Sequence, residues 1–198
     1  MAAMLMGAWS LQSCDNEPTK EVWLDEFGQD SCYVQDWGML EVNRSVVHTP
    51  LTVNGVVYER GLGAHSISRL LYDLDGKAVS ISGLAGADDK NLFAGKLQFK
   101  ILGDKKELWK SGVMQKGDPV KEFNVNLKGV DKVLLLVEEC GDGIMYDHAD
   151  WLNVKITTRG DVKPVPAWAK PVAEVYPYAS CSRKSGHQQS AGLWRTSG

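Results

Sequence analysis

Residues 132–157 read KVLLLVEECGDGIMYDHADWLNVKIT and contain two strand-like runs on either side of a polar, aromatic loop. The first run, Lys132–Val137, is continuously apolar after its lysine, and the second, Leu152–Thr157, mixes apolar with polar residues. Gly141 and Asp142 favour a loop between them, because Gly reaches positive φ freely and Asp bonds to its own nearby backbone. A loop of this kind between two core strands is where a binding site on a rigid β scaffold is expected.

Strand patterns recur throughout residues 21–158. Apolar residues that alternate with polar ones predict three strands with one buried face: Val79 and Ile81; Leu97, Phe99 and Ile101; Phe123, Val125 and Leu127. Asn54-Gly55, between Leu51–Val53 and Val56–Tyr58, predicts a hairpin with a type I′ turn. Asp75-Gly76 and Leu102–Asp104 mark two further turns. No window of eleven or more residues has a helical period, so we predict an all-β fold, an antiparallel β-sandwich with jelly-roll order as the refinement.

Composition limits the partners and the cofactors. The chain has 198 residues, 43% of them apolar, which is enough for one domain with a real core plus tails. A net charge of −3 with scattered basic residues excludes a nucleic-acid partner, which would need a basic face. The four cysteines have no C-x-x-C spacing, so a zinc cluster is not expected. Cys32 and Cys140 either pair or remain separate thiols.

The first fourteen residues resemble a bacterial lipoprotein signal. Met1–Ser13 is apolar and short, and Leu11-Gln12-Ser13-Cys14 is similar to a lipobox, in which a small residue precedes a cysteine that is lipidated after cleavage. Gln12 and the lack of a preceding basic residue depart from the usual pattern; the alternative is a short N-terminal strand or helix. We expect lipidation at Cys14, a tether over 15–20, and a location in the cell envelope (outer membrane or cell surface), or else secretion. The segment is too short to span a bilayer.

The C-terminal part changes in composition. The proline-rich stretch Lys163–Pro171 predicts a semi-rigid linker over 159–178, since each Pro fixes φ and removes a donor. Residues 179–198 have no apolar period and are predicted to be disordered, because they cannot bury enough surface to offset their ordering entropy. A linker normally leads to another domain, so this tail indicates a truncated reading frame.

Four segments, in this order, are similar to a known module. They are GLGAHS at Gly61–Ser66, YDLDG at Tyr72–Gly76, GADD at Gly86–Asp89 and DHADW at Asp147–Trp151, with Leu108–Met114 between the last two. The ordered set resembles the NPCBM family, the carbohydrate-binding module first noticed beside family 98 glycoside hydrolases, over about 21–158. Ala64, Ala87 and Met145 depart from the family's usual Thr, Val and frequent Asn. The change at Met145 leaves the sugar identity open.

The resemblance implies a galactose-binding-like sandwich that binds glycans or polysaccharides, often with galactose, and has no catalysis of its own. It also implies a glycoside hydrolase as the usual covalent partner, here lost by truncation. Trp37, before Gly38, is a candidate stacking platform for a sugar, or else a cap on the core. Trp151, where the loop enters a strand, is expected in the core.

Further polar residues are candidates for sugar contacts. His65 and His148 can each donate to a sugar hydroxyl, although His148 can equally be held by its neighbouring carboxylates. Asp147 is a candidate in the same loop. Arg60 either contacts vicinal hydroxyls or, as its residue type favours, forms an ion pair. Asp88 and Asp89 are candidate ligands of a structural calcium ion, although no EF-hand spacing is present.

Two other functions stay open at the level of sequence. Asp147 and Asp150 can be interpreted as the paired carboxylates of a glycosidase, although such pairs usually flank the substrate from different elements. A domain that recognises protein, for adhesion or assembly, is the second alternative, because exposed aromatic residues serve either purpose.

Overall fold

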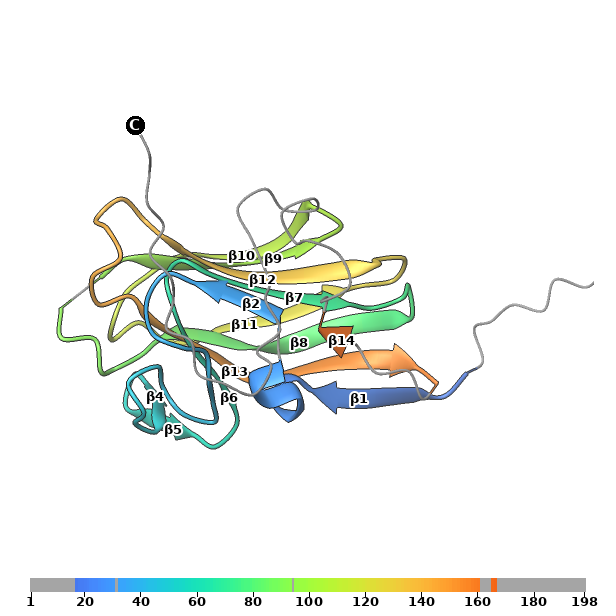
Figure 1. Ribbon diagram of the computed structural model, residues 1–198, viewed down its shortest axis with the longest axis horizontal. Coiled ribbons are helices and arrows are strands. Elements are labelled where there is room, and N and C mark those ends of the chain that lie inside the picture. The colour runs from blue at the N-terminus through green and yellow to red at the C-terminus, as the bar shows by residue number, and fades with distance from the viewer. Residues whose placement is uncertain (1–16, 31, 94, 161–164, 167–198) are drawn as a thin grey trace, which may run out of the picture.

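Two antiparallel sheets and one hairpin make up the part of the protein that the structure describes. The computed structural model describes residues 17–30, 32–93, 95–160 and 165–166 (Figure 1). The predicted signal with Cys14, the predicted tail and most of the predicted linker lie outside the described residues. Among the described residues, the structure has no helix that is long and apolar enough to cross a membrane.

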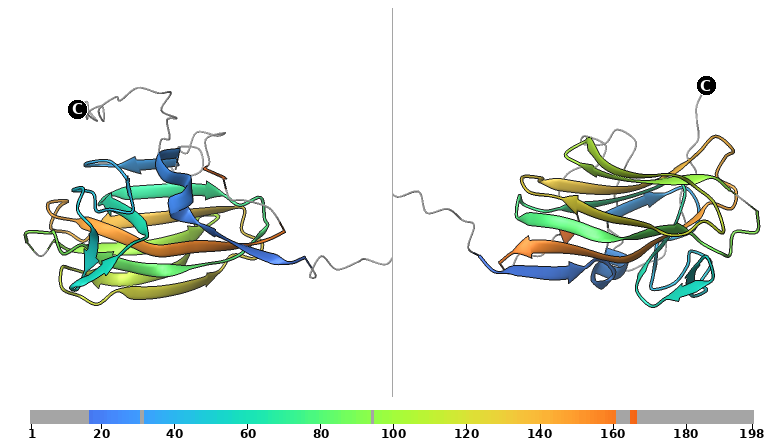
Figure 2. Two further views of the ribbon diagram at one scale, coloured as in Figure 1. Left: turned by 90° about the horizontal axis from the view of Figure 1, so that it is seen from below. Right: turned by 180° about the vertical axis from the view of Figure 1, so that it is seen from behind.

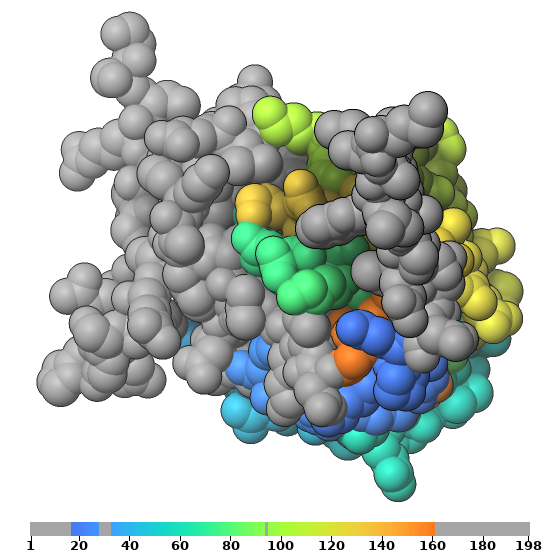
Figure 3. Space-filling view, turned by 90° about the vertical axis from the view of Figure 1, so that its right-hand side faces the viewer, coloured from blue at the N-terminus to red at the C-terminus, as the bar shows by residue number. Residues whose placement is uncertain are grey.

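The first sheet has six strands. Its order is β11 (Lys121–Asn126), β8 (Ala78–Ala87), β13 (His148–Arg159), β6 (Gly61–His65) and β3 (Glu41–Val42), and β1 (Thr19–Trp23) also pairs with β13. β6 and β1 share one edge of β13, since β6 pairs with its first half and β1 with its second half. Figure 3 shows β1, in blue, against the end of β13, in orange.

The second sheet also has six strands. Its order is β10 (Lys106–Met114), β9 (Leu97–Gly103), β12 (Lys132–Glu139), β7 (Ser68–Asp73) and β14 (Val165–Pro166), and β2 (Cys32–Gln35) pairs with β7 beside β14. A short 3₁₀ helix, Leu24–Asp30, joins β1 to β2. β13 runs on to Arg159 and β14 pairs with the sandwich, so strand structure extends into the range predicted as linker.

The core lies between the two sheets, which stack as layers in Figure 2. The predicted alternation in β9 and β11 is confirmed, because their apolar residues are buried between polar ones. Trp151 has no exposed surface, and its ring packs edge-on against Phe99 and Phe123, with centroids 4.9 and 5.7 Å away. The prediction that Trp151 belongs to the core is therefore confirmed.

The register of β8 corrects one prediction. Ala78 and Ile81 belong to the core, whereas Val79 is only partly buried. The reason is an irregularity in the pairing of β8 with β13. Ser80 pairs with Thr157 and Ala78 pairs with the next residue, Thr158, so β8 has one residue more than β13 at this point. Because successive strand residues point to opposite faces, such a shift moves the inward position from one residue to its neighbour.

The predicted hairpin is confirmed as β4 (Leu51–Val53) and β5 (Val56–Tyr58). Asn54 and Gly55 have φ of 48° and 78°, the two positive values of a type I′ turn. Leu51 and Val53 pack on Leu152 of β13, outside the main core. The hairpin therefore covers the outer side of the first sheet.

Candidate functional site

Two histidines from distant parts of the chain are brought together by strand register. His65 ends β6 and His148 begins β13, and the two residues are paired across these antiparallel strands. Their ring centroids are 5.5 Å apart. The loop predicted over 141–151 therefore ends at Asp147, because the backbone of β13 from His148 onward pairs with β6 and, from Ala149, also with β8.

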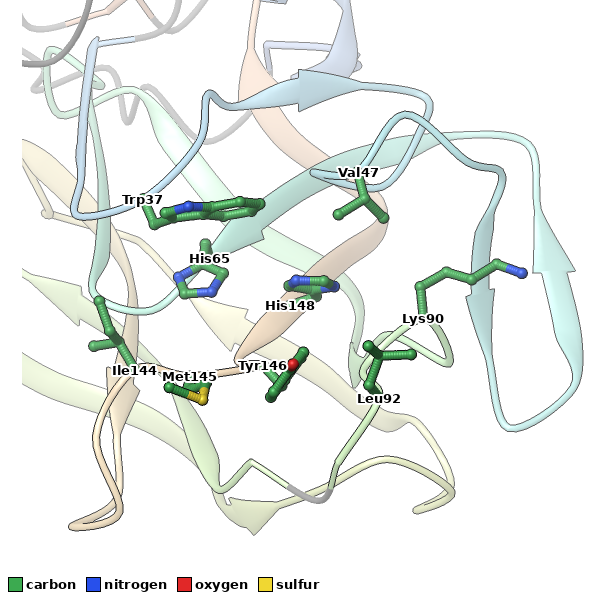
Figure 4. A pocket seen from close by; sticks show the side chains of 9 residues that line it. All are labelled: Trp37, Val47, His65, Lys90, Leu92, Ile144, Met145, Tyr146 and His148. Atoms are coloured by element: carbon green, nitrogen blue, oxygen red, sulfur yellow. The ribbon is translucent and has the colours of Figure 1, made fainter.

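Trp37 completes an aromatic cluster with the two histidines (Figure 4). Its ring stacks on His148, with 5.8 Å between centroids and 9° between planes, and lies 5.0 Å from His65. Gln35 holds Trp37 in place, since its side chain accepts from the His65 N–H at 3.1 Å and donates to the Trp37 carbonyl at 2.8 Å. Trp37 keeps 48% of its surface exposed and does not cap the core.

The cluster forms one wall of a pocket of about 600 Å³, a size typical of small-ligand sites. Nine described residues line it: Trp37, Val47, His65, Lys90, Leu92, Ile144, Met145, Tyr146 and His148. None of the nine is a carboxylate or a carboxamide. The pocket thus offers an aromatic surface, a few polar atoms and a largely apolar wall.

The protonation of His65 follows from its contacts. Its Nδ1 lies 2.6 Å from the Ser66 carbonyl oxygen, which can only accept, so Nδ1 carries the proton. Burial lowers the pKa of His65, although the Ser66 carbonyl and Asp36 favour the charged form. The ring is therefore neutral at pH 7, and its Nε2 is an acceptor. In this state Nε2 of His65 is free to accept a hydrogen bond, whereas the donor role expected from the sequence would need the other tautomer or the protonated ring.

His148 is held through its backbone. The Asn91 side chain accepts from the His148 N–H at 2.8 Å and donates to its carbonyl at 3.0 Å, and Asp88 N–H donates to the same carbonyl. Asp147 and Asp150, proposed from the sequence as possible partners of its ring, make no hydrogen bond to it, and the buried Nδ1 has no partner. Burial lowers the pKa of His148, partly offset by Asp88.

Asp147 lies beside the pocket but does not line it. Its side chain is buried and accepts from the Ser66 hydroxyl at 2.5 Å. Burial raises the pKa of Asp147 from 3.8 to about 6, with Asp142 and Glu139 adding to the rise and the Ser66 hydroxyl opposing it. Asp147 therefore fixes the Ser66 side chain, in the residue that follows His65.

A second acidic group lies deeper. Asp150 is fully buried, and burial raises its pKa well above the ordinary value, assisted by the charge of Asp88 and a hydrogen bond with it. Asp150 therefore holds its proton more tightly than an ordinary carboxyl does. Neither Asp147 nor Asp150 lines the pocket, so the two carboxylates do not flank the space in which a sugar would lie, as the glycosidase alternative requires.

The two candidate calcium ligands have other roles. Asp89 accepts from the Asn54 and Gly55 N–H groups at 3.0 and 2.7 Å and so ties the hairpin turn to this loop. Asp88 accepts from the Lys90 N–H at 2.6 Å, and its charge helps to raise the pKa of Asp150. Within the part of the chain that the structure describes, no group of three or more His, Cys, Asp or Glu residues is placed to hold a metal ion.

Two further candidates lie outside the pocket. Arg60 pairs with Asp25 at 2.9 Å, and its guanidinium lies 4.4 Å from the centroid of Trp23. This is the ion-pair role that its residue type favours. Cys140 has a free thiol in the structure.

Sequence reasoning missed most of the apolar wall. The loop predicted over 141–151 contains Ile144, Met145 and Tyr146. Of these three, the sequence pointed only to Met145, and only as a departure from the family pattern. Lys90 and Leu92 lie one and three residues after Asp89. The GADD motif therefore identified the loop that lines the pocket, but not the side chains of that loop that do so. Gln35 and Asn91 had no sequence signal, since they act through backbone contacts with residues distant in sequence.

A family model and curated relatives match this chain. The model of the NPCBM/NEW2 domain matches residues 20–157. The alpha-1,3-galactosidase B of Akkermansia muciniphila is 29% identical over 130 residues, which are 64% of this chain and 16% of that protein. The chain thus spans about a sixth of that relative's length.

Solved structures share the fold. The CBM51 module of Clostridium perfringens GH95, in complex with methyl-galactose, has a TM-score of 0.63 and 25% identity, with 69% of this chain and 99% of that chain covered. The M60 catalytic domain of Clostridium perfringens ZmpB with its CBM51-1 and CBM51-2 domains gives a TM-score of 0.64 and 28% identity, with 71% and 15% covered.

Proposed function

Because the chain belongs to the NPCBM/NEW2 domain family, we propose that it is a non-catalytic carbohydrate-binding module whose ligand is a glycan that contains galactose. The observation that carries this proposal is the half-exposed Trp37, stacked on His148 and beside His65 at the wall of a pocket. A sugar has an apolar ring face that packs on an aromatic side chain and hydroxyls that need a few well-placed polar groups.

The polar atoms of the pocket suit a neutral sugar. His65 Nε2 accepts from one hydroxyl, while the Tyr146 hydroxyl, on another part of the lining, supplies a donor. The buried carboxyls below the pocket keep the scaffold in place and take no part in acid–base chemistry. Affinity for a single sugar unit is expected to be weak, about 0.1–1 mM or roughly 4–5 kcal/mol.

Weak binding becomes useful when the module is attached to something else. The GH95 relative is a binding module in complex with methyl-galactose, and the Akkermansia relative is an alpha-1,3-galactosidase. We assign this chain the same kind of role, as an accessory to a glycoside hydrolase that acts on galactosides. Attachment near a polysaccharide raises the effective sugar concentration, so millimolar affinity is enough.

A glycan array with the full chain tests the function directly, with and without calcium. Binding to galactose-containing glycans, lost in Trp37→Ala and kept in the control Val57→Ala, is the expected result, since Val57 is exposed on β5 outside the pocket. Silence across all hexose glycans would favour the protein-recognition alternative. Release of reducing sugar by the same protein would contradict the non-catalytic role.

The proposal includes a location in the cell envelope through a lipid on Cys14. It is supported by the similarity of Leu11–Cys14 to a lipobox. Metabolic labelling with an alkyne fatty acid in the native host tests it. The label is expected in the wild type and absent in Cys14→Ser, and an unlabelled wild-type protein in the soluble secreted fraction would contradict it.

A further inference from the structure

Four large apolar side chains stand exposed along the mouth of the pocket. Leu92, Phe93 and Met145 expose 72, 68 and 72% of their surface, and Ile144 exposes 37%. They come from two loops, the one after β8 and the one before β13, and three of them line the pocket directly. We call these four residues the apolar rim. Exposed apolar patches of this extent usually mark a binding surface.

The two loops that carry the rim are fixed to each other. The Phe93 ring packs edge-on against Tyr146, with 5.0 Å between centroids. Asn91, which directly precedes Leu92, is bonded to the backbone of His148 on both sides. Gly95 lies so close to the other loop that an added Cβ would be 2.7 Å from the Tyr146 carbonyl oxygen. The rim is therefore a built surface that continues the pocket.

The chemistry of the rim differs from that of the histidine wall. Trp37, His65 and His148 combine an aromatic surface with ring nitrogens, whereas the rim has only hydrocarbon, phenyl and thioether groups. A second sugar laid on the rim would lose water from its hydroxyls without gaining hydrogen-bond partners, which is unfavourable. An apolar group in the same place would gain from the water it displaces. A thioether and a phenyl ring also favour contact with an aromatic group.

Resting on the proposed function, we propose that the apolar rim is a second subsite, which takes an apolar group attached directly to the sugar in the pocket. The preferred ligand is then the end of a glycoconjugate in which the sugar carries an apolar aglycone, and not the interior of a polysaccharide. The rim adjoins the sugar pocket, and this continuity identifies the group next to the sugar as its occupant (Figure 4).

Titration of the full chain with matched glycosides tests this subsite. Methyl and phenyl galactosides, in both anomers, are compared by calorimetry, since both remain monomeric. The phenyl glycoside of the preferred anomer is expected to bind at least about fivefold more tightly than the methyl glycoside. In Phe93→Ser, the ratio of the two affinities is expected to fall below twofold. The ratio is the readout because Phe93 packs on Tyr146 of the pocket lining, so that loss of this contact changes both affinities together and leaves their ratio to report the rim. Val113→Ser, which changes an equally exposed apolar residue on β10, is the matched control and keeps both affinities.

The outcomes separate the rim from the function of the pocket. Equal affinity for methyl and phenyl galactosides would overturn the second subsite and leave the sugar-binding function intact. No binding of any glycoside, together with a silent array, would instead remove the proposed function. Phenyl glycosides of sugars that the array rejects, bound as tightly as phenyl galactoside, would overturn the link between rim and pocket. A concentration-dependent dimer in sedimentation, lost in Phe93→Ser, would assign the rim to a second copy of the chain and also overturn the proposal.

Discussion

His65 and His148 are partners across antiparallel strands β6 and β13, and their rings lie 5.5 Å apart under the Trp37 platform. Side chains directly opposite on an antiparallel pair point to the same face of the sheet. The two family segments GLGAHS and DHADW therefore act as one unit, which supplies the polar wall of the pocket. Four testable consequences follow from the contacts around this pair.

Sugar affinity should depend on the protonation of His65. Its pKa is lowered by burial, so the ring is neutral near pH 7 and Nε2 accepts a hydroxyl. As pH falls below about 6.5 and through the lowered pKa, the protonated ring loses this acceptor. Calorimetry should show constant affinity from pH 8 to 6.5 and a decline as the pH falls further. His65→Gln should bind with little pH dependence, and His48→Gln, outside the pocket, should behave as the wild type. Unchanged affinity at pH 4.5 would contradict the role of His65.

Asp147 should make the domain more stable in mild acid. Its pKa in the folded protein is raised to about 6, above the 3.8 expected in the unfolded chain. The unfolded chain therefore releases this proton first, and the stability that the protonated carboxyl supplies is complete below about pH 4 and is lost as pH rises to 6. The expected loss of unfolding free energy is roughly 2 kcal/mol. Urea unfolding at pH 4, 5, 6 and 8 measures it.

The Asp147→Asn variant separates this carboxyl from the others. The amide cannot ionise and its oxygen still accepts from Ser66, so the fall in stability between pH 4 and 6 should become smaller by the same amount. Glu122→Gln, at an exposed position on β11 and distant in sequence from this loop, is the control and should keep the wild-type slope. An Asp147→Asn profile that matches the wild type would show that Asp147 is not the titrating group.

Asn91 should support both stability and binding. Its replacement by Ala leaves the His148 N–H without a partner in a buried place, which costs about 2 kcal/mol. The loop that carries Leu92 also loses its attachment to β13, so the affinity for sugar should fall several-fold. Denaturant unfolding and calorimetry measure the two effects. Asn124→Ala, exposed on β11, should change neither; an Asn91→Ala variant as stable as that control would contradict the role given to Asn91.

Gln35 should affect binding more than stability. Its side chain links the Trp37 carbonyl to the His65 N–H at the surface, where water can replace either contact. Gln35→Leu should therefore lower the unfolding free energy by less than about 1.5 kcal/mol. The sugar affinity should weaken about fivefold, because Trp37 is no longer held over the histidines. Gln98→Leu on β9 is the control and should leave the sugar affinity unchanged. A dissociation constant equal to that of the wild type would rule out a positioning role for Gln35.

Local pattern was enough to predict most of the strands. The alternation at Leu97–Ile101 and the Asn54-Gly55 turn depend on residues a few positions apart, and both predictions were confirmed. The error at Val79 arose because an irregularity in the pairing of β8 with β13 has no trace in the sequence of β8. The motif Gly61–Ser66 has a clear reason in the fold. A Cβ on Gly63 would lie 2.3 Å from the Arg44 carbonyl oxygen, so only Gly at this position allows the backbone of the segment after β3 to pack this closely.

The sequence by itself determined the all-β class, the core position of Trp151 and the family, because these depend on residue periodicity, side-chain size and motif order. Only the tertiary structure decided which candidates share a site. Strand register set His65 opposite His148 and buried Asp150. Loop packing buried Asp147, and the loop after β2 brought Trp37 over the histidines. Register and loop packing are long-range properties, set by the burial of all strands together, so no local stretch of sequence encodes them.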